Sequence, residues 1–174
     1  MSETNTIKVL TTGGTVDKIY SLAGELEIGD PAAPDILGIV RPTFSFTVDS
    51  VLRKDSLDLT DDDRQLLCDH LNQVTEKRVV ITHGTDTMTV TADYLQAHAR
   101  NLTDRVVVFT GAMQPASLKV TDSHFNLGAA FAAVQLLDPG IYIAMSGRIF
   151  PVGSVIKDRA QGQFVAVTTD SEHS

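Results

Sequence analysis

Four short, unbroken apolar runs constrain the fold of this 174-residue chain more than any other feature. They are rich in β-branched residues and hardly alternate between polar and apolar positions: Ile7–Thr11, Val79–Thr82, Val106–Thr110 and Ile141–Met145. Runs of this kind are typical of strands that are buried on both faces, as in parallel sheets. A fifth run, Phe44–Leu52, alternates in part, and we expect it to form a strand nearer an edge of the sheet.

Helical patterns separate these runs. Three acidic residues follow Thr60, which is typical of a helix N-terminus because threonine caps it and the acids complement the helix dipole. Apolar residues then recur at helical spacing in three groups: Leu67, Leu71 and Val74; Met88, Ala92, Leu95 and Ala99; and Phe125, Ala129, Ala132 and Leu136. Strands that alternate with helices form right-handed βαβ units. The sequence therefore predicts a doubly wound, mainly parallel α/β sheet with helices on both faces, a Rossmann-like or flavodoxin-like three-layer sandwich.

Two segments lack a clear period. The stretch Val16–Pro34 contains glycines and prolines, and we expect a long loop there that is functional or mobile. It follows the first strand directly, where a lid over a site would lie. From Ser146 onward, glycines and a proline interrupt short apolar pieces, and we expect irregular structure that leaves room for a hairpin.

The composition narrows the class of protein. With 14 Lys and Arg against 22 Asp and Glu the formal charge is −8, and no Lys/Arg-rich run is present, so we expect no nucleic-acid partner. Cys68 is the single cysteine, which excludes an internal disulfide and a cysteine-based metal cluster. No apolar stretch reaches the about 18 residues that cross a bilayer, and the N-terminus lacks the pattern of a secretory signal. We therefore expect a cytoplasmic chain without a membrane partner, with residues 1–174 forming a single domain.

Hydroxyl groups and glycines follow all four buried strands. The segments are Thr11–Thr15, Thr82–Thr87, Thr110–Met113 and Ser146–Arg148. In an open parallel sheet these segments meet at one edge, where such folds bind ligands. Any one of them alone is explained by an ordinary turn, but the four together indicate a site.

The residue types at this edge limit the chemistry. The glycine patterns of dinucleotide and P-loop sites are missing, and no histidine pair has a metal-binding spacing, so we expect neither a cofactor nor a metal. His83 could reach the site or simply form the turn. A threonine hydroxyl can act as a nucleophile only if a base takes its proton, and a lysine of lowered pKa could be that base. Asp86 could bind a substrate ammonium group, while composition does not single out the lysine.

Five blocks of the chain occur in the order of one known family: Thr12–Thr15, Asp55–Asp58, His83–Met88, Thr110–Pro115 and Lys157. They resemble the bacterial-type L-asparaginases, whose two signatures are matched by Thr12–Thr15 and His83–Met88. The resemblance thus covers nearly the whole chain in the right order. It implies hydrolysis of L-asparagine to L-aspartate and ammonia through a threonine nucleophile, without metal or cofactor.

The resemblance also implies a role for each matching residue. Thr12 would be the nucleophile and Tyr20, on the long loop, its activating partner, while Thr85 would form a second catalytic group with Lys157 and Asp86. The substrate's α-carboxylate and α-ammonium would be held by Ser56 and Asp86, helped by backbone groups of Gly84 and Thr85. The carbonyl of Ala112 would accept a hydrogen bond from the substrate's side-chain amide. Backbone N–H groups would stabilise the oxyanion.

The chain departs from the family in length. Asparaginases are usually about twice as long, with a smaller C-terminal domain that supplies an acid next to the Tyr–Thr pair, and we expect that domain to be absent here. Glu25 or Glu27 is a conceivable substitute. Neighbouring subunits could also close the site, so we expect a homo-oligomer, a dimer or a tetramer.

Three functions remain open at this point. An asparaginase acting on a small amino-acid amide is favoured, because a mere sensor would not need Lys157. The alternative is a weak or inactive amino-acid-binding or sensor module with the same fold. The amidase half of a tRNA-dependent amidotransferase is disfavoured by the acidic charge and the lack of an extra domain.

Overall fold

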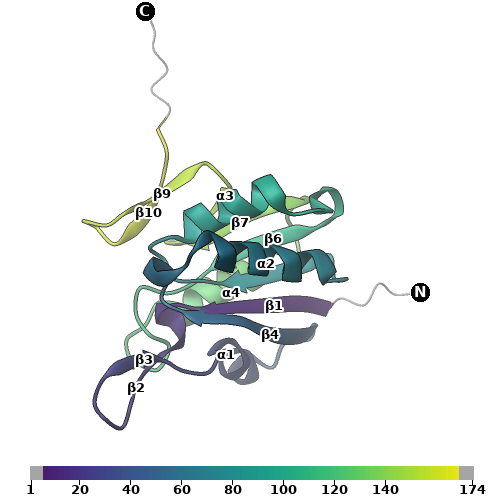
Figure 1. The fold of residues 1–174 in the computed structure, drawn as a ribbon. Helices are drawn as coiled ribbons and strands as arrows, with labels where there is room; N and C mark the ends of the chain where they lie inside the picture. The colour runs from purple at the N-terminus through teal and green to yellow at the C-terminus, as the bar shows by residue number, and fades with distance from the viewer. Residues whose placement is uncertain (1–5, 169–174) are drawn as a thin grey trace, which may run out of the picture.

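The apolar runs pair into one six-stranded sheet in the computed structural model, which describes residues 6–168 (Figure 1). In order across the sheet the strands are β4 (Ser45–Lys54), β1 (Thr6–Gly13), β5 (Arg78–Thr82), β6 (Val106–Thr110), β7 (Gly140–Met145) and β8 (Arg148–Pro151). The first five run parallel, and β8 is antiparallel to β7. The mainly parallel sheet predicted from the sequence is confirmed, as is the edge position of the partly alternating strand β4.

Two helices cover each face of the sheet. On one side lie α2 (Asp61–Gln73) and α3 (Met88–His98), and on the other α1 (Ala33–Val40) and α4 (Ser123–Ala133). Neighbouring residues of one strand serve opposite layers: Val107 and Phe109 belong to the core under α2 and α3, and Val108 to the core under α1 and α4. Both faces of the strand are therefore buried, which explains the unbroken apolar runs and confirms the three-layer sandwich.

The strand order defines where a ligand can bind. The chain passes from β1 to β4 on one side and then returns to β5 on the other side of β1. This is the flavodoxin-like order, in which the direction of travel across the sheet reverses between the strands corresponding to β1 and β5. Ligands of such folds bind beyond the carboxyl ends of the strands at this reversal.

Helices α2 and α3 form as their sequences predict. The Thr60 hydroxyl accepts a hydrogen bond from the Asp63 N–H, and the Asp63 carboxylate accepts one from the Thr60 N–H, so a capping box starts α2. Val74 lies just past the end of the helix and is buried. Cys68 is also buried, as a packing residue of this layer. In α3, Met88, Ala92 and Leu95 face the core.

Helix α4 presents a different face from the one its pattern predicts. Phe125 is 66% exposed and Leu136, beyond the helix end, is 87% exposed. The buried face carries Ser123, Asn126, Leu127, Ala130 and Phe131 instead. The helix itself carries apolar residues on all sides, so their spacing alone does not select the face that is buried. The Asn126 amide favours the observed face, because it donates to the Gly111 carbonyl in the turn after β6, and it also donates to the Asp122 carboxylate at the start of α4.

The two segments without a clear period are more ordered than expected. Within the predicted long loop, a 3₁₀ turn (Thr15–Asp17) leads into a hairpin of β2 (Lys18–Tyr20) and β3 (Leu26–Ile28), and α1 begins at its end. In the tail, β8 joins the sheet and a second hairpin forms from β9 (Val155–Asp158) and β10 (Gln163–Ala166). The expected hairpin is confirmed, while the expectation of irregular structure was wrong for most of this tail. Both hairpins lie toward the end of the sheet where β1 ends (Figure 1).

Candidate active site

The turns that carry hydroxyl groups meet at one edge of the sheet. Thr11 of β1 pairs with Thr82 of β5, and Thr82 pairs with Thr110 of β6. The residues that follow these threonines therefore emerge side by side. Because β1 and β5 flank the reversal of strand order, this edge is the position at which the fold binds ligands.

Two glycines, which have no side chain, allow three turns to come into contact. A Cβ atom on Gly14, whose φ is +80°, would lie 2.4 Å from the backbone of Gly84. A Cβ atom on Gly84 would in turn lie 2.6 Å from the Cβ atom of Ser56. The turn after β1, the 3₁₀ turn after β4 (Ser56–Asp58) and the turn after β5 are thus in direct contact, which explains why glycine occupies both positions.

Thr12, near the end of β1, is fully buried. Its hydroxyl donates a 3.0 Å hydrogen bond to the Thr82 carbonyl. A carbonyl oxygen is an acceptor but no base, so this contact orients the hydroxyl without deprotonating it.

Thr85, Asp86 and Lys157 form a connected group although Lys157 comes from the distant hairpin strand β9. The Lys157 ammonium donates to the Thr85 hydroxyl and to the Asp86 carboxylate, both at 2.8 Å. The side chains of Lys157 and Asp86 are 15% and 28% exposed. A cation this close to a hydroxyl stabilises a negative charge on its oxygen, and after losing its proton the amine could accept one from it.

Ser56 is buried and is held from two sides. The Thr87 hydroxyl donates to the Ser56 carbonyl at 2.7 Å, and Asp55 caps the 3₁₀ turn by accepting from the Leu57 N–H. The Lys18 ammonium lies 2.7 Å from the Asp55 carboxylate and holds the pKa of that carboxyl below its usual range. This ion pair links the start of the β2–β3 hairpin to the turn that carries Ser56.

His83 is fully buried, and its ring bonds to the backbone of its own turn and to helix α3. One ring nitrogen lies 2.7 Å from the Gly84 carbonyl, so it carries the proton, and the other accepts from the Thr91 hydroxyl at 2.8 Å. Burial lowers the pKa of His83 to about 4, so the ring is neutral at pH 7. The Thr91 oxygen in turn accepts from the Arg64 guanidinium at 3.2 Å. This chain, the His83 network (His83, Thr91 and Arg64), anchors the turn that carries Thr85 and Asp86.

Residues 6–168 match the family model described as "Asparaginase, N-terminal". The chain belongs to the asparaginase family. The resemblance inferred from the five sequence blocks is therefore confirmed at the level of the family.

Relatives of this asparaginase-family chain come from several organisms. It is 28% identical over 169 residues to a glutaminase-asparaginase of Acinetobacter glutaminasificans, covering 88% of this chain and 50% of that protein. It is 30% identical over 166 residues to a probable periplasmic L-asparaginase of Haemophilus influenzae, covering 87% and 46%. Its fold matches the thermostable L-asparaginase of Thermococcus kodakarensis with a TM-score of 0.83 at 28% identity, over 93% of this chain and 51% of that one. The chain thus spans about half the length of the relatives it matches.

The other predicted residues of the asparaginase site lie at different depths. Ala112 is fully buried just beyond β6. Tyr20 is 64% exposed on β2, and within residues 6–168 its phenol makes no hydrogen bond. Glu25 and Glu27 are exposed on the same hairpin. The structure brings Thr12, Ser56, Gly84, Thr85, Asp86, Ala112 and Lys157 to one edge, whereas the role of Tyr20 stays a prediction.

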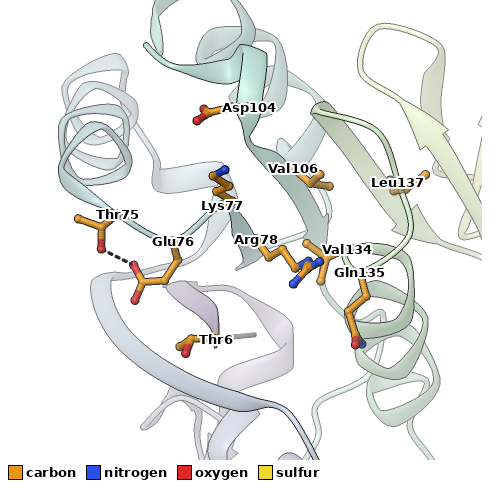
Figure 2. A pocket seen from close by; sticks show the side chains of 10 residues that line it. All are labelled: Thr6, Thr75, Glu76, Lys77, Arg78, Asp104, Val106, Val134, Gln135 and Leu137. Atoms are coloured by element: carbon orange, nitrogen blue, oxygen red, sulfur yellow. Dashed lines mark hydrogen bonds between the residues drawn. The ribbon is translucent and has the colours of Figure 1, made fainter. Parts of the chain in front are cut away.

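Surface hollows lie at both ends of the sheet strands. One of about 430 Å³ is lined by Thr6, Thr75–Arg78 and Val106 among others (Figure 2). Because Thr6, Arg78 and Val106 begin their strands, this hollow lies at the amino ends and includes none of the predicted site residues. Another, of about 660 Å³, lies beyond β6 and β7, between Met113, Phe125 and Ser146. It is next to Ala112 and belongs to the same edge as the candidate site.

The sequence analysis missed residues that contact the predicted site residues from outside the site. Arg64 and Thr91 were not singled out, because each stands on a helix, 27 residues from the other, and only the fold joins them. Arg159 was missed as well, although it follows the predicted Lys157 by two positions.

Within residues 6–168 no group of three or more His, Cys, Asp or Glu side chains could hold a metal ion. In the same residues no helix has the length and apolar character needed to cross a membrane.

Proposed function

We propose that this chain is an amidohydrolase that converts L-asparagine to L-aspartate and ammonia, with Thr12 as the nucleophile. The observation that carries the proposal is the contact of Lys157 with both Thr85 and Asp86, across 72 and 71 residues of sequence, beside the buried Thr12 turn. A module that only bound an amino acid would have no use for a half-buried lysine on a threonine hydroxyl. Membership of the asparaginase family and the names of the relatives support the same activity.

Binding would precede chemistry. In this proposal Ser56 and the N–H groups near Gly84 and Thr85 hold the α-carboxylate, and Asp86 holds the α-ammonium. The Ala112 carbonyl accepts a hydrogen bond from the side-chain amide and turns its carbon toward Thr12. Fixing the substrate in this way replaces a bimolecular encounter by a reaction between neighbours.

The reaction would take place in two steps. The Thr12 oxygen attacks the amide carbon, its proton passes to the leaving nitrogen, and ammonia departs from an acyl-enzyme. Water then attacks the ester carbon, and Thr12 regains a proton as L-aspartate leaves. The Thr85–Lys157 pair relays protons, and backbone N–H groups stabilise the oxyanion in both steps.

Tyr20 would assist from the β2–β3 hairpin. In the structure its side chain is 64% exposed, so its proposed role as activating partner of Thr12 requires the hairpin to close over bound substrate. The Lys18–Asp55 ion pair would stay in place as the base of that movement.

We further propose that residues 1–174 act as one domain within a homo-oligomer, a dimer or a tetramer. The cytoplasmic location stays a prediction, since one relative is named periplasmic.

Ammonia release by the purified chain tests the proposal. L-asparagine and L-glutamine would be supplied from micromolar to tens of millimolar, because one relative is named for both amides. Thr12→Ala, prepared in the same way, measures any asparaginase carried over from the host. Activity that disappears in this variant supports the proposal, and a folded wild type that releases no more ammonia than the variant refutes it.

A further inference from the structure

Asp86 is shared by two cations. The Arg159 guanidinium lies 3.5 Å from the same Asp86 oxygen that Lys157 contacts at 2.8 Å. Arg159 follows β9 in the turn toward β10, and the Asp158 carboxylate fixes that turn by accepting from the N–H groups of Ala160 and Gln161. The hairpin therefore delivers Lys157 and Arg159 together to one carboxylate.

The charges at this point do not balance. Lys157 and Arg159 bring two positive charges to the single negative charge of Asp86, and both contact its Oδ1 atom. Within residues 6–168, the Oδ2 atom has no hydrogen bond or ion pair. Asp158 is the nearest acid along the chain, but within residues 6–168 it forms no ion pair with Lys157 or Arg159, and its Oδ1 atom accepts from the N–H groups of the turn. A ligand at Oδ2 therefore meets a carboxylate whose attraction for cations is already reduced by the second cation.

We propose that Arg159 determines substrate specificity by weakening the preference of Asp86 for an α-ammonium group. This inference rests on the proposed function, in which Asp86 binds that group. The site then also accepts four-carbon acids and amides that carry the carboxylate but lack the ammonium. Arg159 is 63% exposed, so solvent screens its charge and the effect on relative affinity is modest, about two- to fivefold.

Two ligands that differ only in the ammonium group test this role. L-aspartate and succinate would be titrated into the wild type and into Arg159→Gln, and the ratio of the two dissociation constants recorded. We expect Arg159→Gln to raise the ratio of Kd for succinate over Kd for L-aspartate about two- to fivefold. Arg159→Lys, which keeps the charge, should retain the wild-type ratio. Arg100→Gln removes the same charge from an exposed residue after α3 and should leave the ratio unchanged.

The outcomes separate this inference from the proposed function. An unchanged ratio in Arg159→Gln, an equal shift in Arg100→Gln, or a wild type that binds neither acid would overturn it. Weaker binding of both acids by the same factor would also overturn it, since Arg159 would then bind the shared carboxylates. Ammonia release from L-asparagine is scored separately: a shifted ratio without hydrolysis upholds the role of Arg159 and refutes the proposed reaction.

Discussion

The turn after β5 and the β2–β3 hairpin carry proposed catalytic residues in opposite ways. In the turn, Thr85 and His83 are buried. The His83 network and the Gly14 contact hold its backbone, and Lys157 holds the Thr85 side chain. The hairpin is attached at its base, and its side chains Tyr20 and Leu22 are 64% and 110% exposed. In the proposed mechanism one region is therefore organised before substrate binds, while the other has to close over the substrate.

Removing Lys157 should have the largest effect. Lys157→Met keeps an apolar stem but neither donates to Thr85 nor accepts its proton, so we expect kcat to fall about 100-fold or more. Steady-state ammonia release measures the change, and circular dichroism confirms the fold. Lys119→Met, at an exposed position, is the control. Full turnover in Lys157→Met would mean that the organised turn is not the catalytic one.

Asp17 tests the base of the hairpin. It is buried, its carboxylate accepts from the Ala32 N–H, and burial raises its pKa from 3.8 to about 6 against the opposing effects of that bond and of Arg53. The folded state thus binds this proton more tightly than the unfolded state, so Asp17 lowers stability progressively as pH rises from about 4 to about 6. Asp17→Asn keeps the acceptor and should raise the free energy of unfolding by about 1–3 kcal/mol at pH 7.5.

Urea unfolding at two pH values measures this effect. The gain from Asp17→Asn should be present at pH 7.5 and should shrink at pH 4.5, because the wild-type carboxyl is then largely protonated. An equal gain at both values would show that Asp17 does not hold a raised pKa at the hairpin base. Asp35→Asn, on the exposed side of α1, should leave the free energy of unfolding unchanged at both pH values.

Thr91→Val tests whether the His83 network fixes the turn. The substitution removes the partner of one His83 ring nitrogen and of the Arg64 Nε atom, and a buried polar atom left unpaired costs about 1–3 kcal/mol. We expect a loss of stability in this range together with a several-fold lower kcat. Thr89→Val, in the same helix, is the matched control. If both variants behave alike, the turn is held by its glycine contacts rather than by this network.

Tyr20→Phe should have the smallest effect on stability. Because the side chain is largely exposed, we expect the free energy of unfolding to change by less than about 0.5 kcal/mol. If the hairpin closes over substrate as proposed, kcat should still fall about tenfold. Leu22→Ser, at the hairpin tip, provides a control for surface changes. Wild-type turnover in Tyr20→Phe would leave the hairpin without a chemical role.

The same contrast explains what could be predicted from the sequence. The sheet and the position of the site follow from local patterns. Strands buried on both faces need nearly continuous apolar runs, which are easy to recognise, and the carboxyl ends of parallel strands meet at one edge. Strands β2 and β3 are three residues each, too short to show a period. The face of α4 depends on Asn126, which bonds to the Gly111 carbonyl in the turn after β6, a contact that only the fold creates. The pairing of Lys157 with Asp86 spans 71 residues, so the family resemblance rather than any spacing predicted it.

A double-substitution cycle of Thr85→Val and Lys157→Met tests the central claim most directly. If the two side chains act as one unit, each single variant should release ammonia from L-asparagine about 100-fold more slowly than the wild type, and the double variant should be no slower than either. Losses that multiply to about 10,000-fold would show that the two groups work independently. A wild type with no turnover, or single variants with full turnover, would contradict the assignment of the turn after β5 as a catalytic centre.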